Sequence, residues 1–93
     1  MMKSLKIICK TDAGKKAVQQ HMSEFHKARI KKLAFKKLVR QEVTSDNPYT
    51  FEITITNATY AGLVNPKHFK EEIVEVMLKN GAEEDKDYSI EVE

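Results

Sequence analysis

The residues of this sequence best suited to chemistry are cations, and they gather in one stretch. Residues 27–40 hold seven Lys and Arg and no acidic residue: Lys27, Arg29, Lys31, Lys32, Lys36, Lys37 and Arg40. Clustered cations bind a polyanion by displacing its counterions, without reading its sequence. One hypothesis is therefore that this segment contacts the phosphate backbone of a nucleic acid. The competing interpretation is a solvated helix end and edge strand, where lysines discourage edge-to-edge aggregation.

A second candidate site is the pair Tyr60 and His68, which flank the loop before a predicted helix. A phenol and an imidazole placed there can line a ligand pocket between the loop and the sheet, although such residues more often anchor the loop. The layout of this half of the chain is loosely similar to that of the dimeric α/β-barrel oxygenases. The resemblance implies a small-molecule-binding or oxygenase-like dimer that pairs through the open face of its sheet.

Neither a metal site nor covalent catalysis is predicted. His21 and His26 are five residues apart, whereas paired ligands on a helix need a spacing of three or four. Cys9 is expected on the core face of a strand, where a thiol behaves as a small hydrophobe. The turn 11–16 lacks the first glycine and the last Ser or Thr of a phosphate loop, so we expect an ordinary helix cap there. We expect no cofactor and favour a role other than enzymatic.

Charge is segregated along the chain, although the net charge is only +2. Residues 1–40 contain twelve Lys and Arg and two acidic residues, whereas residues 41–93 contain four Lys and twelve acidic residues. Opposite charges on two surfaces attract one another and steer association. The leading hypothesis is a non-enzymatic interaction module acting through protein partners or self-association, with head-to-tail or two-fold pairing of basic and acidic surfaces.

Length and composition indicate one domain, residues 1–93. The sequence is 41% hydrophobic, which suffices for one core and not for two. It has no apolar stretch long enough to cross a membrane, and the apolar run near its start is interrupted by Lys6 and too short for a signal peptide. A single cysteine forms no internal disulfide, so a reducing cytoplasm is the expected compartment.

Periodicity predicts the elements that position these residues. Alternation of apolar and polar residues indicates strands at 49–57 and 87–93, and at 5–10, where Ile8 shares the outer face with Lys6 and Lys10. Helical spacing of Val18, Met22, Phe25 and Ala28 predicts a helix from Ala13 onward.

Residues 37–44 are expected to form a strand that reaches the next one through the turn 45–48; the rival interpretation continues the first helix to Gln41. Residues 58–64 are expected to be a connection. A second helix should begin at Asn65-Pro66 and stop at Asn80-Gly81.

The order strand-helix-strand-strand-helix-strand predicts an α+β fold of the ferredoxin-like split βαβ type, with two helices on one face of a four-stranded antiparallel sheet. Right-handed crossovers set the strand order as 4-1-3-2. Lys6 should then lie between Glu52 and Glu91 on the open face, which would carry no aromatic residue. Because RNA-binding plaits stack bases on aromatics at this surface, the sheet itself is not expected to bind RNA.

Overall fold

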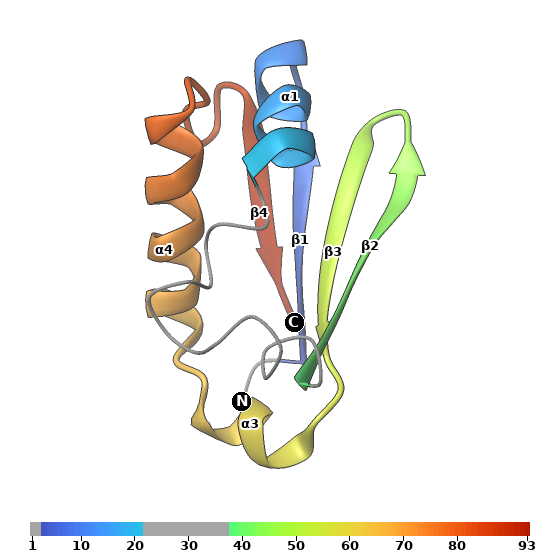
Figure 1. Ribbon diagram of the computed structural model, residues 1–93, viewed down its shortest axis with the longest axis vertical. Helices are drawn as coiled ribbons and strands as arrows, with labels where there is room; N and C mark the ends of the chain where they lie inside the picture. Colours follow the sequence, from blue (N-terminus) through green and yellow to red (C-terminus); the bar gives the residue numbers. More distant parts are fainter. Residues whose placement is uncertain (1–2, 22–37) are drawn as a thin grey trace.

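A computed structural model of the protein describes residues 3–21 and 38–93. Within them the elements follow one another as β1 (Ser4–Cys9), α1 (Asp12–His21), β2 (Val39–Asp46), β3 (Tyr49–Ile55), α3 (Ala58–Leu63), α4 (Pro66–Lys79) and β4 (Tyr88–Val92). The strands form one sheet; in Figure 1, α1 lies in front of the sheet and α4 stands to the left of β4. The predicted α+β class with a four-stranded antiparallel sheet is confirmed.

The sheet has the strand order β2-β3-β1-β4, and every neighbouring pair is antiparallel. β1 is therefore flanked by β3 and β4, where the sequence places it. Lys6 lies opposite Glu52 on one side and Glu91 on the other, as the sequence predicts.

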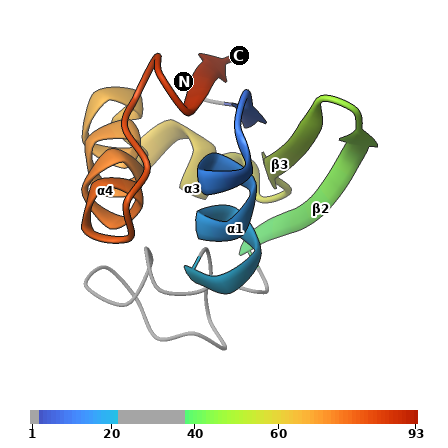
Figure 2. The ribbon, with the colours of Figure 1, turned by 90° about the horizontal axis from the view of Figure 1, so that it is seen from above.

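Both longer helices cover the same face of the sheet. Seen from above, α1 and α4 lie side by side on the inner side of the curved strands (Figure 2), and the two helices are in contact. The short helix α3 lies at the end of the molecule where β3 finishes (Figure 1). This leaves the opposite face of the sheet uncovered by any described element.

The core lies between the sheet and this helical layer. Alternation in β1 buries Leu5, Ile7 and Cys9 on the face toward the helices. The other large side chains that are fully buried come from the neighbouring strands and from α4: Ile53, Tyr88, Phe69, Ile73 and Met77. Because these helical residues recur every four residues, one face of α4 completes the core.

The beginning of α1 is tied to the loop before β4. Thr11 Oγ1 accepts a hydrogen bond from the Gly14 amide at 3.3 Å, so Thr11 is the residue that caps this helix. Thr11 also donates through the same oxygen to Asp87 Oδ1 at 2.7 Å. A Cβ on Gly14 would overlap the Asp87 carbonyl group, so only glycine permits this approach. The predicted continuation of the helix beyond His21 lies outside the described residues.

A β-hairpin follows, and the rival interpretation of a helix continuing to Gln41 is wrong. β2 and β3 pair from Val39 opposite Ile55 to Asp46 opposite Tyr49, so the turn is the dipeptide Asn47-Pro48 rather than the four residues predicted. A register irregularity between Val43 and Ser45 allows the strand to continue past its predicted end at Thr44.

The second half of the chain departs from prediction in one element. Residues 58–63, expected as a connection, form α3, whose first turn is capped by Asn57 Oδ1 accepting from the Tyr60 amide at 2.9 Å. α4 begins and ends as predicted: Asn65 accepts from the amides of its first turn, and Gly81 follows the helix with φ of 87°. α3 therefore starts with an asparagine cap. The mostly apolar residues after the cap made this helix difficult to predict from the sequence.

Candidate functional site

The basic segment of the sequence is described at its final residues only. Lys27, Arg29, Lys31, Lys32, Lys36 and Lys37 lie outside the described residues. Arg40 lies on β2 with its Nε 3.4 Å from Glu42 Oε1 on the same strand. Both side chains are about half exposed, so this ion pair is largely screened by solvent.

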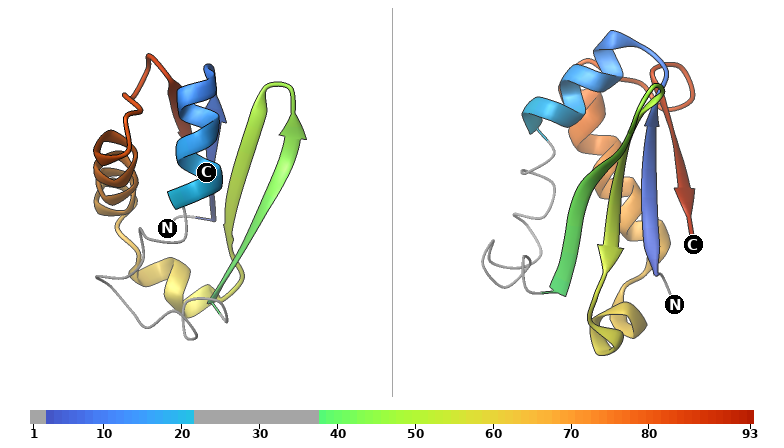
Figure 3. Two further views of the ribbon diagram at one scale, coloured as in Figure 1. Left: turned by 45° about the horizontal axis from the view of Figure 1, so that its top comes forward. Right: turned by 90° about the vertical axis from the view of Figure 1, so that its right-hand side faces the viewer.

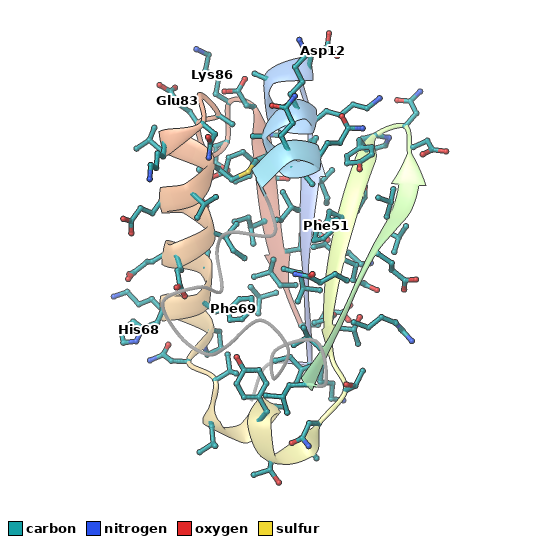
Figure 4. The ribbon with its side chains drawn as sticks, viewed as in Figure 1. Asp12, Phe51, His68, Phe69, Glu83 and Lys86 are labelled. Atoms are coloured by element: carbon teal, nitrogen blue, oxygen red, sulfur yellow. The ribbon has the colours of Figure 1, made fainter. Side chains whose placement is uncertain are left out.

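Tyr60 and His68 do not share a surface in the described structure. Tyr60 is on α3, half-buried and packed against the core. His68 is exposed in the first turn of α4, and Figure 4 shows it pointing away from the sheet while its neighbour Phe69 points toward it. The two side chains therefore face different environments.

The predicted cap at the start of α1 borders a cleft of about 400 Å³. One wall is the turn from β1 into α1, and the other is the hairpin turn between β2 and β3. Lys15 Nζ lies 5.4 Å from the centre of the Tyr49 ring, a cation–π contact that joins the two walls. Because Asp12 and Asp46 also line the cleft, its charges balance and favour no ligand of one sign.

Two buried groups have raised pKa values, and neither is arranged for catalysis. Burial raises the pKa of the Cys9 thiol to about 11, so the thiolate that nucleophilic attack needs is scarce at neutral pH. Burial, reinforced by Glu84 and then by Asp85 and Asp87, raises the pKa of Tyr88 to about 12. The Tyr88 hydroxyl has no hydrogen-bond partner in the part of the chain that the structure describes.

The open face of the sheet carries one row of charges across all four strands. Glu42 on β2 faces Glu52 on β3, Lys6 follows on β1, and Glu91 completes the row on β4. The Lys6 ammonium is 3.8 Å from the Glu52 carboxylate. Glu42 therefore has a carboxylate as its cross-strand neighbour, which is unfavourable in an antiparallel pair. No His, Cys, Asp or Glu grouping suited to a metal occurs among residues 3–21 and 38–93.

The outer edge of β2 combines an exposed apolar side chain with a buried amide that has no partner among the described residues. The strand forms one border of the sheet, with no described element beyond it (Figure 3). Val43 is 44% exposed, which is high for a valine, although its side chain points to the core face of the sheet. The Nε2 atom of Gln41 is buried without a hydrogen-bond partner in the described part of the chain.

Sequence reasoning identified this strand but did not identify its edge as a site. The sequence did contain one signal for the edge: Arg40 and Glu42 alternate with Val39, Gln41 and Val43. Such a pattern can be compared with a second copy of itself to see whether opposite charges would pair. The contact between Thr11 and Asp87 had no comparable signal, because 76 residues separate the two side chains.

No described helix is both long enough and apolar enough to cross a membrane. Comparison of the chain with protein-family models, with curated proteins and with solved structures finds no match in any of the three.

Proposed function

We propose that this protein is a non-enzymatic interaction module built on a ferredoxin-like plait, acting by self-association or through a protein partner in a reducing cytoplasm. The strand order β2-β3-β1-β4, with α1 and α4 on one face, supports the plait. Many unrelated functions use that topology, so the functional part of the proposal rests on a surface and not on the fold.

The observation that carries the function is the outer edge of β2. It offers backbone amides and carbonyls that no described strand pairs, an exposed apolar side chain at Val43, and both signs of charge at Arg40 and Glu42. An exposed strand edge is a template for pairing with another chain. The opposite edge, β4, has only acidic charges among its residues.

Proline substitution at the two edges tests this function with a matched pair of variants. Val43 and Val92 are similarly exposed, at 44% and 41%, and both have backbone amides that point away from the sheet. Proline at such a position removes only an outward N–H and leaves the internal ladder intact. We expect Val43→Pro to abolish association and Val92→Pro to preserve it.

Association is measured by sedimentation of the full chain at low and high salt, together with retention of partners from a cell extract on immobilised protein. A partner counts only if Val43→Pro loses it and Val92→Pro keeps it. A wild-type monomer at both ionic strengths that also retains no such partner contradicts the proposal.

Nucleic-acid binding is the second candidate, favoured by where the positive charge is concentrated. The described residues contain ten Lys and Arg against thirteen acidic residues, whereas residues 22–37 contain six against one. Binding to duplex DNA or RNA should then weaken steeply as salt rises, and changing Lys31, Lys32, Lys36 and Lys37 to Gln should abolish it. Absence of binding at low salt contradicts this alternative.

Ligand binding by Tyr60 and His68, in an oxygenase-like dimer, stays a third proposal. Its support is the chemistry of the two side chains alone. It requires a metabolite that raises the melting temperature of the wild type and not that of His68→Ala.

A further inference from the structure

The backbone of β2 has a defined set of groups along its outer edge that no described strand pairs. The Thr56 amide donates to the Leu38 carbonyl at 2.9 Å, so the backbone groups of residue 38 point toward β3. In an antiparallel ladder this direction alternates from one residue to the next. The amides and carbonyls of Val39, Gln41 and Val43 therefore point outward, away from β3.

These outward groups allow a second β2 strand to pair antiparallel about a two-fold axis perpendicular to the sheet. Side chains directly opposite one another must share a face, so the axis can pass through residue 40, 41 or 42 near the middle of the strand. An axis at residue 40 sets Arg40 against itself, and an axis at residue 42 sets Glu42 against itself. Like charges directly opposite are destabilising.

Only the axis at Gln41 pairs opposite charges. It places Arg40 opposite the partner's Glu42, and Glu42 opposite the partner's Arg40. Val39 then faces the partner's Val43 on the other face, in a pair that exchanges backbone hydrogen bonds. We propose that two copies of this chain pair along β2 in this register, forming a continuous eight-stranded sheet; this assignment rests on the proposed interaction function and names its partner.

Two features of the single chain are changed by this arrangement. Glu42, which faces Glu52 and pairs with its own Arg40 inside one copy, gains a second guanidinium from the partner's Arg40. The exposed surface of Val43 is covered by the partner's Val39.

The other strand edge offers no equivalent. Among the residues of β4 and the one that follows it, Glu91 and Glu93 are charged and no cation is present, so two β4 edges repel or ignore each other. Pairing of β2 with the β4 edge of another copy can place Arg40 opposite the partner's Glu91. That contact is heterologous and leaves a free edge at each end, so it produces open chains of molecules rather than a dimer.

Charge reversal on β2 tests the register. Arg40→Glu places two carboxylates opposite each other at both pairs, and Glu42→Arg places two guanidinium groups there. We expect each single variant to dimerise about tenfold or more weakly than the wild type. The double variant Arg40→Glu/Glu42→Arg restores opposite charges at both pairs, so its dissociation constant should return to near the wild-type value.

Mixing the two single variants supplies a second readout. In the mixture a chain carrying Arg40→Glu meets a chain carrying Glu42→Arg with attraction at both pairs, so a one-to-one heterodimer should form from two weakly associating proteins. Sedimentation equilibrium gives the dissociation constants, and circular dichroism and thermal melts verify that every variant is folded. Glu71→Arg on α4 is the matched control, since it reverses an exposed charge away from the edge.

The outcomes separate this inference from the function on which it rests. A wild-type dimer whose strength ignores both single reversals, or a double variant that stays monomeric, overturns the register. If the wild type forms open-ended assemblies and Glu91→Arg abolishes them, the contact is between β2 and the β4 strand of another copy instead. A wild-type monomer that retains a protein partner sensitive to Val43→Pro overturns self-pairing and leaves the interaction function standing.

Discussion

At the scale of single residues, Asp87 connects the loop before β4 to the start of α1, although 76 residues separate it from Thr11. Its carboxylate accepts hydrogen bonds from the Glu83 amide at 2.8 Å and from the Thr11 hydroxyl at 2.7 Å. Its carbonyl accepts from the amides of Lys10 and Thr11. The bond from the Glu83 backbone, followed by that from Thr11, lowers the pKa of the Asp87 carboxyl below its ordinary value of 3.8.

Asp87→Asn should change how stability depends on pH. A carboxyl whose pKa is lowered in the folded state stabilises it above the pKa of the unfolded chain and loses that contribution as pH falls through the folded value. We expect the variant to be less stable than the wild type at pH 7, and the difference to shrink below about pH 4. Urea unfolding across this pH range measures it, with the exposed Asp85→Asn as control; a difference independent of pH contradicts the expectation.

Cys9 should be inert in the folded protein. Its thiol is 5% exposed and its pKa is raised to about 11 by burial, so both access and ionisation oppose attack. We expect slow alkylation by iodoacetamide near neutral pH and rapid alkylation in denaturant, followed by mass spectrometry. Complete modification of the native protein as fast as the denatured one contradicts this prediction.

At the scale of elements, α1 is held by a close approach and not by a large apolar face. Gly14 lies against the Asp87 carbonyl, and Ala17 and Val18 supply the buried side chains in the described part of this helix. The space at Gly14 therefore controls how near the helix comes to the loop before β4. By contrast, α4 buries three large side chains and depends less on any one contact.

Gly14→Ala should destabilise the protein although alanine favours helix formation. The gain in helix propensity is about 1 kcal/mol, whereas the new methyl group overlaps backbone atoms and forces the helix outward, which typically costs about 1–3 kcal/mol. Thermal or urea unfolding measures the change. Gly62→Ala on α3, where a Cβ has open space, is the matched control and should be neutral or stabilising.

At the scale of the whole molecule, some of the described charges are paired, as where the Lys6 ammonium lies 3.8 Å from the Glu52 carboxylate. The row from Glu42 to Glu91 contains a single lysine, and Lys70 is 3.0 Å from Glu84 beside α4. Part of the segregation seen along the sequence is therefore neutralised locally. What remains in the described structure is an excess of carboxylates, two of which, Glu42 and Glu52, face each other at the β2 edge.

Salt should weaken the proposed dimer without abolishing it. Exposed ion pairs are screened as the Debye length shortens, whereas backbone hydrogen bonds and the valine contacts are much less affected. We expect the dissociation constant of the wild type to rise by less than about tenfold between about 50 mM and about 500 mM salt. The dissociation constant of the neutral variant Arg40→Gln/Glu42→Gln should hardly change with salt. If this variant is as sensitive to salt as the wild type, other charges cause the effect.

Much of the fold was predictable because it depends on local pattern. The alternation in Leu5, Ile7 and Cys9 predicted the buried face of β1, and Asn65-Pro66 predicted the first turn of α4. The predicted hairpin turn was too long. The strand continues into that turn after a register irregularity that follows Val43, and this irregularity depends on how the two strands pair and not on either sequence alone. The helix α3 was missed because its cap, Asn57, ends a strand pattern and starts a helix at the same point.

By itself, the sequence determined the class of the fold, the order of the strands and the position of Lys6 between two carboxylates. Periodicity and turn chemistry act over a few residues, and the handedness of crossovers restricts the topology of the whole chain. Each of these features therefore follows from the sequence alone. Only the tertiary structure decided which backbone groups of β2 no described strand pairs, and that the Gln41 amide is buried without a partner among the described residues. Which backbone groups point outward, and which side chains are buried, depends on neighbouring strands that come together only when the chain folds. The candidate surface could therefore be identified only in the folded sheet.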